Sequence, residues 1–405
     1  MIANSSLFSQ LLQLVPIPTF RRIVREEGGE RCAKGFTCRM QLVAMLYLQL
    51  AQAKSLAEIC DGLRLTCGKL NHLGITAAPA KSSLAYANEH RPAKIYERIF
   101  HAVLQQAHEW RPGKKRRFRF KQQLFTLDST LLELCATLFP WAHYQQRKGA
   151  AKLHLVLDND GYLPTYAVIT EGKVADITVA RQLTFPKGSI IVIDRGYCDY
   201  KLFHTWTKDG VFFVTRLKDN AKFTTKQTLI PPRRRNIVSD EVFCFSKDYA
   251  WERCPTPLRR VVVRDTTGEE IALLTNNFTL GATTISAIYR ERWQIEIFFR
   301  NIKQCLRIKT FVGTSANAFA VQIWTALLAM LLVAICRFRS TFGWHLSQLA
   351  AMLRVSLFTY RDLGNWLNDP FETPPISPPE QLKLTIYTAK LRKKSENSTI
   401  CKQIF

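Results

Sequence analysis

The sequence predicts a mixed α/β protein in which a helical N-terminal region precedes a sheet-containing core. Apolar residues recur with a helical period through residues 1–110. From about residue 118 the pattern changes to alternating runs and short Val/Ile-rich runs separated by turn residues, which are typical of strands. The length of 405 residues and an apolar content of 47% suffice for two or three domains, each with a core of its own.

The charge of the chain indicates a polyanionic partner. The sequence has 57 Lys and Arg against 32 Asp and Glu, which gives a formal net charge of +25. Nucleic acid and an anionic membrane are the two candidate partners. The 25 Phe and 8 Trp exclude a disordered basic tail as the main source of this charge, because such tails lack the residues of a core.

Several features predict a cytoplasmic protein. The 11 cysteines form no C-x-x-C pair, so neither a zinc ribbon nor a disulfide framework is expected. The N-terminus lacks the basic region of a secretory signal. The stretch "AFAVQIWTALLAMLLVAIC", residues 318–336, approaches the length of a membrane span, but it contains Gln322 and Thr325 and no other span accompanies it. We therefore expect a buried core helix and no membrane partner.

The helical region of residues 1–110 is predicted to be a separate domain. Within it, residues 78–100 have the layout of a helix-turn-helix, and a plain helical bundle is the alternative. A basic segment, "RPGKKRRFRFK" at residues 111–121, follows it and carries seven Lys or Arg residues. Its Pro-Gly start marks a domain boundary.

The core is predicted to begin with residues 118–218. Its elements are a strand in "FRFKQQLFTLD", two strands around the turn Asn159–Gly161, a helix in "VADITVARQL" and a buried strand in "GSIIVID". A helix that ends at Gly210 and a strand in "VFFVTRLK" complete this part. Residues 219–282 then interrupt the alternation with a hairpin that turns at Gly268, which predicts an inserted β-rich subdomain.

Helices account for the remainder. Residues 283–335 are predicted to be the second part of the core, built on the long helix "YRERWQIEIFFRNIK" and the apolar helix after it. Residues 336–405 are predicted to contain C-terminal helices, a Pro-rich linker and a basic tail.

Two aspartates occupy positions that are costly in a packed core. We expect Asp128, in "FTLDST", to close the first core strand, and Asp194, in "IIVIDRGY", to close the fourth. A single aspartate at a strand end is usually a turn or helix cap. Two on one sheet indicate that something binds there, because a carboxylate without a partner is unfavourable in a core.

The long helix supplies a third carboxylate among cations. At 100° per residue, Tyr289, Arg292, Glu296, Arg300 and Lys303 share a face about 80° wide. A ladder of ordinary ion pairs would give similar spacing. It would not explain the excess of cations over acids on this face, and cations without acidic partners are typical of phosphate binding.

Together, the carboxylates of Asp128, Asp194 and Glu296 form an all-oxygen ligand set, which suits Mg²⁺ or Mn²⁺ better than Zn²⁺. Such ions activate a water or a 3′-hydroxyl and stabilise the leaving oxygen in phosphodiester displacement. The chemistry predicted is metal-dependent phosphoryl transfer on nucleic acid. The sequence has no P-loop, so a nucleoside triphosphate is not the expected substrate.

At this point the sequence resembles a known family. The spacing Y289-x2-R292-x3-E296-x6-K303 is similar to the Y-R-E-K signature of bacterial insertion-sequence DDE transposases. The stretches "LDST" and "IDRGY" resemble the two aspartate motifs of that branch. The resemblance covers roughly residues 118–335.

The resemblance implies an RNase H-like catalytic core with Asp128, Asp194 and Glu296 as the catalytic, metal-binding triad. It further implies cut-and-paste transposition through hairpin-ended DNA, with Mg²⁺ as the cofactor and Mn²⁺ as a substitute. The implied partners are double-stranded DNA, at the terminal inverted repeats and at the target, and a second copy of the chain in the synaptic complex. A transposase of this kind would lie in the cytoplasm of a prokaryote, associated with the nucleoid.

The resemblance also implies DNA-binding roles for residues of the signature helix. Tyr289 and Arg292 would hold backbone oxygens near the scissile phosphate, Lys303 would hold the terminal strand, and Arg300 would also bind DNA. Trp293, and as an alternative Trp251, would stack on an extruded base. Residues 1–110 would recognise the terminal repeats.

Two other functions stay open on the sequence alone. One is a DNA-binding protein or transposition inhibitor that keeps the fold without the chemistry. The other is a metal-dependent nuclease of the same fold that does not carry out strand transfer. The complete triad and signature favour the transposase over the inhibitor.

Overall fold

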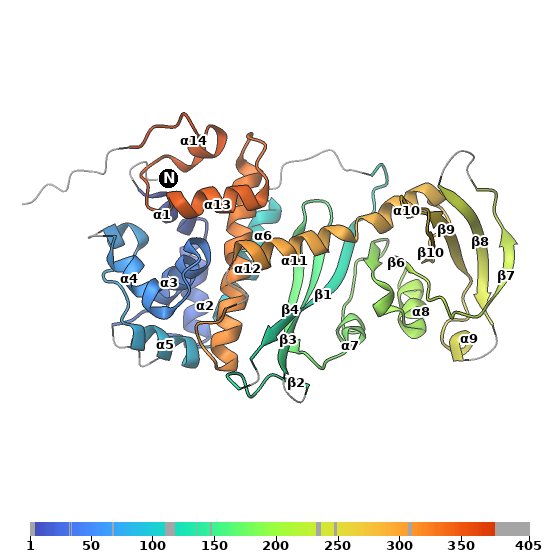
Figure 1. The fold of residues 1–405 in the computed structure, drawn as a ribbon, viewed down its shortest axis with the longest axis horizontal. Coiled ribbons are helices and arrows are strands. Elements are labelled where there is room, and N and C mark those ends of the chain that lie inside the picture. The colour runs from blue at the N-terminus through green and yellow to red at the C-terminus, as the bar shows by residue number, and fades with distance from the viewer. Residues whose placement is uncertain are drawn as a thin grey trace, which may run out of the picture.

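The structure is a computed structural model that describes residues 5–31, 33, 35–66, 69–109, 118–135, 137–145, 148–231, 236–246, 249–306 and 310–376. The molecule is elongated, with helices at one end, a sheet in the middle and β-hairpins at the other end (Figure 1). The basic segment of residues 111–121 is described only from residue 118, and the basic tail lies outside the described residues.

The first and last parts of the chain form one helical body. Its N-terminal elements are α1 (Leu7–Leu12), α2 (Ile17–Glu26), α3 (Cys38–Ala51), α4 (Leu56–Arg64), η1 (Lys69–Leu73), α5 (Lys81–His90) and α6 (Lys94–Glu109). Its C-terminal elements are α12 (Ala316–Arg339), α13 (Leu346–Ser356) and α14 (Leu363–Asn368). Both sets contribute to one hydrophobic core, and a β-bridge between Ser6 and Tyr360 joins the N-terminal set to the C-terminal one.

Helix α12 is the centre of this body. It is long and apolar enough to cross a membrane, but 94% of its most apolar window is buried inside the protein, as in a core helix. Helices α3, α5 and α6 pack against it. The segment proposed as a helix-turn-helix thus uses both of its helices, α5 and α6, in the packing of a bundle.

The sheet has the RNase H-like order of strands, as predicted. Its core strands are β1 (Leu124–Leu134), β3 (Lys148–Asp158), β4 (Leu163–Glu171), β5 (Ile190–Ile193) and β6 (Phe212–Arg216). They lie in the order β4-β3-β1-β5-β6, with β1, β3 and β4 antiparallel and with β5 and β6 parallel to β1. The short strand β2 (His143–Gln145) pairs with the first residues of β3, Lys148 and Gly149, on the edge that β4 also occupies.

Helices cover both faces of this sheet. On one face lie α7 (Asp176–Ala180), η2 (Arg195–Tyr197) and α8 (Tyr200–Lys208), and their apolar side chains share a cluster with Phe125 and Ile191. On the other face lie α10 (Ala282–Arg290) and α11 (Trp293–Cys305). Side chains of α10 pack there with Leu124 and Ile190, which directly precede Phe125 and Ile191 in their strands. Odd-numbered and even-numbered residues of β1 therefore face different helices.

The β-rich segment after β6 extends the same sheet. It contains β7 (Phe223–Thr228), β8 (Ile237–Phe245), α9 (Tyr249–Arg253), β9 (Leu258–Arg264) and β10 (Glu270–Thr275). Strands β9 and β10 form the predicted hairpin, and Gly268 at its turn has a φ of 92°, which glycine adopts readily. Because β10 pairs with β6, the sheet continues into this segment and reaches ten strands.

Two sequence-based expectations need correction. The first core strand does not end at Asp128, because β1 continues to Leu134 and stays paired with β3 along this whole length. The residues after Asp128, "STLLEL", belong to the strand because β3 is long enough to pair with them. Asp128 therefore lies in the middle of β1.

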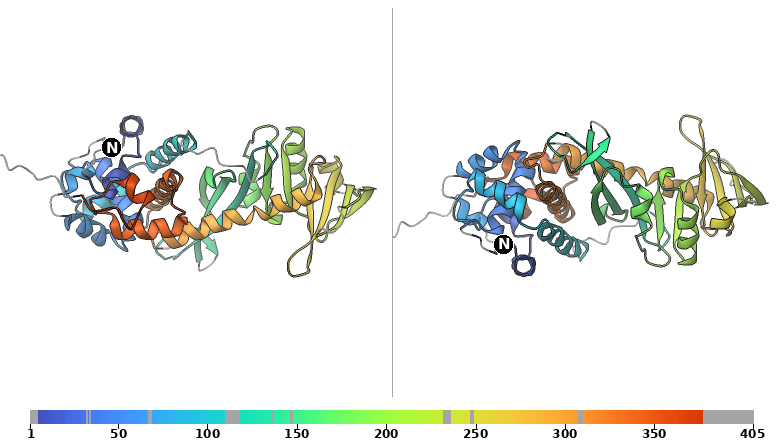
Figure 2. Two further views of the ribbon diagram at one scale, coloured as in Figure 1. Left: turned by 90° about the horizontal axis from the view of Figure 1, so that it is seen from above. Right: turned by 90° about the horizontal axis from the view of Figure 1, so that it is seen from below.

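The second correction concerns the signature helix, which is two helices and not one. Between α10 and α11, the N–H groups of Glu291, Arg292, Gln294 and Ile295 donate to carbonyl oxygens three residues earlier, as in a 3₁₀ turn. The two helices run end to end along the molecule (Figures 1 and 2). Ile288, Ile295, Phe298 and Ile302 are buried, as the periodicity predicted.

Candidate active site

The register of β1 and β5 places Asp128 and Asp194 side by side. These strands are parallel, and Leu124–Leu127 pair in order with Ile190–Ile193. Asp128 follows the last paired residue of β1, and Asp194 follows the last residue of β5. The two carboxylates therefore lie on neighbouring strands at the level where β5 ends, which is where catalytic groups gather in α/β folds.

Asp194 also stabilises the turn that follows it. Its side chain accepts a hydrogen bond from the Gly196 N–H at 3.5 Å and caps the 3₁₀ helix η2. The predicted position of Asp194 at the end of a buried strand is confirmed, since Ile190–Ile193 are fully buried.

Glu296 reaches the same site from α11. This helix contacts β1, and Asp128, Thr130, Glu296, Arg300 and Lys303 line one open groove between the two elements. The Arg292 guanidinium lies 2.5 Å from the Glu296 carboxylate, and the exposed fractions of these side chains are 20% and 31%. Glu296 therefore enters the site as half of an ion pair.

The charges of these groups act on one another. Burial raises the pKa of Asp128 to about 6. The Ser129 N–H and Arg292 act in the opposite direction, while the negative charges of Asp194 and Glu296 add to the increase. Burial raises the pKa of Tyr289, and the charge of Asp194 adds to this increase. Burial lowers the pKa of Arg292, but the charges of Glu296 and, to a smaller extent, Asp194 act against it and raise the pKa overall. The predicted triad and two of the signature residues thus share one electrostatic environment.

The acids form an oxygen-only donor set, which fits a hard divalent cation such as Mg²⁺ or Mn²⁺. Their mutual repulsion is what such a cation would relieve. Among the described residues, no three Asp, Glu, His or Cys side chains converge closely enough to hold a metal ion in the present arrangement. In this arrangement one carboxylate oxygen of Glu296 is engaged in the ion pair with Arg292.

Lys303 contacts the strand that carries Asp128. Its ammonium group donates to the Thr130 hydroxyl at 2.6 Å and to the Leu131 carbonyl oxygen at 3.3 Å. Thr130 lies two residues after Asp128, so their side chains are on the same face of β1. Lys303 is therefore placed at the edge of the groove beside the carboxylates.

The aromatic residues proposed to contact DNA lie near cations. The Arg292 guanidinium lies 5.9 Å from the centre of the Tyr289 ring. The Arg300 guanidinium lies at the same distance, 5.9 Å, from the Trp293 ring. Trp293 is 50% exposed and Trp251, on α9, is 39% exposed, so both rings have a free surface.

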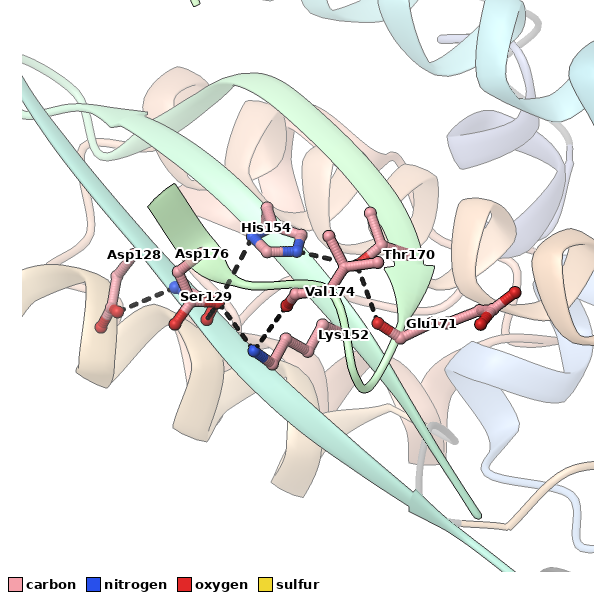
Figure 3. Close-up of polar contacts among 8 residues, drawn as sticks. All are labelled: Asp128, Ser129, Lys152, His154, Thr170, Glu171, Val174 and Asp176. Atoms are coloured by element: carbon pink, nitrogen blue, oxygen red, sulfur yellow. Dashed lines mark hydrogen bonds and ion pairs between the residues drawn. The ribbon is translucent and has the colours of Figure 1, made fainter. Parts of the chain in front are cut away.

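Sequence reasoning missed a polar cluster on the opposite face of β1. Asp176, the first residue of α7, accepts hydrogen bonds from the Ser129 hydroxyl at 2.9 Å and from the Lys152 ammonium at 3.0 Å (Figure 3). The imidazole of His154 lies 3.8 Å from the same carboxylate oxygen. Ser129 was visible in the "LDST" stretch, but Asp176 belongs to no motif, and only the fold brings it to Ser129.

Because burial raises the pKa of Asp128, ionised Asp128 destabilises the folded protein. Well below pH 4 the Asp128 carboxyl is protonated in the folded and in the unfolded protein, so it does not affect the free energy of unfolding. Between pH 4 and about 6 it ionises in the unfolded protein but stays largely protonated in the folded one, so the stability falls as the pH rises. Asp128→Asn should thus be more stable than the wild type at pH 8, by roughly 1–3 kcal/mol, with a smaller gain at pH 5.

Thermal unfolding at the two pH values measures this difference. The matched control is Asp219→Asn, which removes a carboxylate whose side chain is 79% exposed. It should change the stability little at either pH. A wild type as stable as Asp128→Asn at pH 8 would show that the site does not repel the Asp128 charge.

Comparisons with known proteins give consistent results. A family model described as a transposase DDE domain matches residues 97–332, and a model for a domain of unknown function matches residues 3–76. The chain is 30% identical over 308 residues to the putative transposase y4zB of Sinorhizobium fredii, across 74% of this chain and 83% of that protein. It is 28% identical over 333 residues to the probable transposase for insertion sequence element IS5377 of Geobacillus stearothermophilus, across 82% and 84%.

A solved structure is also similar. The piggyBac transposase in a synaptic complex with hairpin DNA aligns with 86% of this chain and 78% of its own, at a TM-score of 0.45 and 12% sequence identity.

Proposed function

The chain belongs to the transposase DDE domain family, and from this premise we propose that it moves an insertion sequence by a cut-and-paste route. Membership of the family makes it a DNA transposase, which is a metal-dependent enzyme that binds and cleaves DNA. The proposed steps are cleavage at the terminal inverted repeats, formation of hairpin ends and transfer of the freed ends to target DNA.

The alignment of Asp128 with Asp194 at the end of β5 is the observation that carries this proposal. Glu296 and Lys303 lie in the groove beside Asp128. We assign Asp128, Asp194 and Glu296 as the ligands of Mg²⁺, for which Mn²⁺ can substitute. When bound, such a cation supplies activation of the attacking water or 3′-hydroxyl and stabilisation of the leaving oxygen.

Arg292 and Glu296 would exchange partners as the site fills. In the free protein each neutralises the charge of the other across 2.5 Å. Once Glu296 serves as a ligand, the Arg292 guanidinium becomes available for a phosphate oxygen, to which it can donate two hydrogen bonds. The ion pair would thus hold both charged groups in place, with no net charge, until DNA binds.

The remaining signature residues would hold the DNA backbone and a base. Tyr289 and Arg292 would bind oxygens near the scissile phosphate, and Arg300 and Lys303 would bind the terminal strand. Trp293 offers its exposed face for stacking on an extruded base. Residues 1–110 would recognise the repeat, two copies of the chain would pair two ends, and the reaction would take place at the nucleoid of a prokaryotic cell.

A cleavage assay tests the proposal. The substrate is a labelled duplex that carries the terminal inverted repeat found next to the gene, incubated with the full chain and Mg²⁺. Nicking at the repeat boundary, followed by a hairpin product, is expected, and excess chelator should abolish both. Binding without cleavage would indicate a protein that keeps the fold for DNA binding, and cleavage without strand transfer would indicate a nuclease.

The Lys303 assignment gives a separate prediction. Lys303→Ala should weaken binding of repeat DNA and lower the slope of log affinity against log salt concentration by about one, since one phosphate contact is lost. The matched control is Lys187→Ala, an exposed lysine before β5, at the opposite end of that strand from Asp194. An unchanged slope for Lys303→Ala would mean that Lys303 only packs on β1.

A further inference from the structure

The polar cluster behind β1 is built from side chains of three elements. Ser129 on β1 pairs in register with His154 on β3, and Lys152 lies two residues before His154 on the same face of that strand. All three side chains point at Asp176 of α7 (Figure 3). The Lys152 ammonium also donates to the Val174 carbonyl oxygen at 2.9 Å, which fixes the segment that leads into α7.

The two β3 side chains of this cluster are largely buried, and the Asp176 side chain is 33% exposed. The exposed fraction is 16% for the Lys152 side chain and 0% for that of His154. His154 shares a hydrogen bond of 2.9 Å between its Nε2 atom and the Thr170 hydroxyl. Burial lowers the pKa of His154 to about 4, so the ring is neutral and Lys152 supplies the positive charge that Asp176 needs.

The cluster is connected to Asp128 through a single residue. The Ser129 hydroxyl donates to Asp176 at 2.9 Å, while the Ser129 N–H donates to Asp128 at 2.8 Å. Ser129 thus lies between the two carboxylates: Asp128 lines the groove, and Asp176 lies on the other face of the strand. A carboxylate whose partner N–H is held in this way has a restricted orientation.

We infer that Asp176 is a positioning residue for the transposase reaction, which orients the Asp128 carboxylate through the hydroxyl and N–H of Ser129. Lys152 holds Asp176 in place from β3. This inference rests on the proposed function, because it assumes that Asp128 binds the reaction's cation. Asp176 itself touches neither DNA nor the reacting atoms.

The test compares single-turnover cleavage of the repeat duplex with binding of the same duplex in Mg²⁺. Asp176→Ala should cleave the duplex about 10-fold to 100-fold more slowly than the wild type, which is the usual loss when a partner of a metal ligand is removed. Its dissociation constant for the duplex should be unchanged. Asp176→Asn keeps an oxygen that accepts from Ser129, so it should lose less than Asp176→Ala.

A double-mutant cycle separates this role from a general loss of structure. If Asp176 acts through the Ser129 hydroxyl, Ser129→Ala combined with Asp176→Ala should cleave no more slowly than the slower single variant. The structural control is Asp199→Ala, which removes the cap of α8 and the partner of Arg181 without touching Ser129. That variant should keep the wild-type cleavage rate.

Several outcomes would overturn the inference. The first is cleavage by Asp176→Ala at the wild-type rate. The second is a double variant whose rate is reduced by the product of the two single reductions. The third is a cleavage rate for Asp176→Asn as low as that for Asp176→Ala. An equal loss in Asp199→Ala would also overturn it. A wild-type protein that does not cleave the duplex at all would instead refute the proposed function, so the two failures are distinguishable.

Discussion

Asp194→Asn should abolish DNA cleavage and leave binding of the repeat DNA intact. The amide has the shape of the carboxylate and can still accept the hydrogen bond from the Gly196 N–H, so the turn after β5 should form. It lacks the negative charge that a divalent cation requires. The loss of several kcal/mol of transition-state stabilisation corresponds to a cleavage rate at least about 10³-fold lower.

The binding half of this prediction has its own physical reason. Removal of a negative charge beside a phosphate backbone reduces repulsion, so the affinity for DNA should stay the same or rise slightly. Rate and affinity are measured on the same labelled duplex. Asp199→Asn, five residues further along the chain, is the control and should cleave normally. An Asp194→Asn protein that cleaves at the wild-type rate would remove Asp194 from the triad.

The largest effect on stability is expected in the inserted β segment, where Arg259 and Asp240 form a buried ion pair. The guanidinium donates to both carboxylate oxygens, at 2.8 and 2.7 Å, and each side chain is 5% exposed. Arg259 also donates to the carbonyl oxygens of Asn277 and Leu280, at 3.2 and 2.6 Å. It thereby ties the end of the sheet to the start of α10, the helix that carries Tyr289.

Asp240→Ala should lower the free energy of unfolding by about 3–5 kcal/mol, because it leaves the buried Arg259 charge with two carbonyl oxygens but no opposite charge. Denaturant unfolding measures the change. The matched control is Glu270→Ala in the same sheet, which removes the partner of Arg264 from a pair whose side chains are 57% and 49% exposed. The control should lose no more than about 1 kcal/mol. Equal decreases in the free energy of unfolding in the two variants would show that burial does not determine how much the Arg259–Asp240 pair contributes to stability.

The sequence predicted those parts of the site that follow from local pattern. Ile190–Ile193 form an apolar run too short for a helix, and an aspartate after such a run is placed at a strand end by the pattern alone. The helical period likewise placed Ile295 and Phe298 in the core and Glu296 beside them. The strands of the RNase H-like sheet, apart from β2, were each recognisable as separate runs.

The features that the sequence did not predict depend mostly on contacts between segments that are distant in the chain. Asp128 is in the middle of β1 because β3 continues to pair with the residues after it, and no local pattern shows how long a partner strand is. The break between α10 and α11 depends on a tightened turn that a fixed helical period does not register. Asp176 meets Ser129 across 47 residues of sequence, which only the fold could show.

We propose that Glu296 joins Asp128 and Asp194 as a ligand of the catalytic cation. Cleavage of the labelled repeat duplex in Mg²⁺, with the wild type beside Glu296→Ala, tests it most directly. Nicking and a hairpin product are expected for the wild type alone, with equal DNA binding by both proteins. Cleavage by Glu296→Ala at the wild-type rate would contradict it, and the Glu296 carboxylate would then serve only as the ion-pair partner of Arg292.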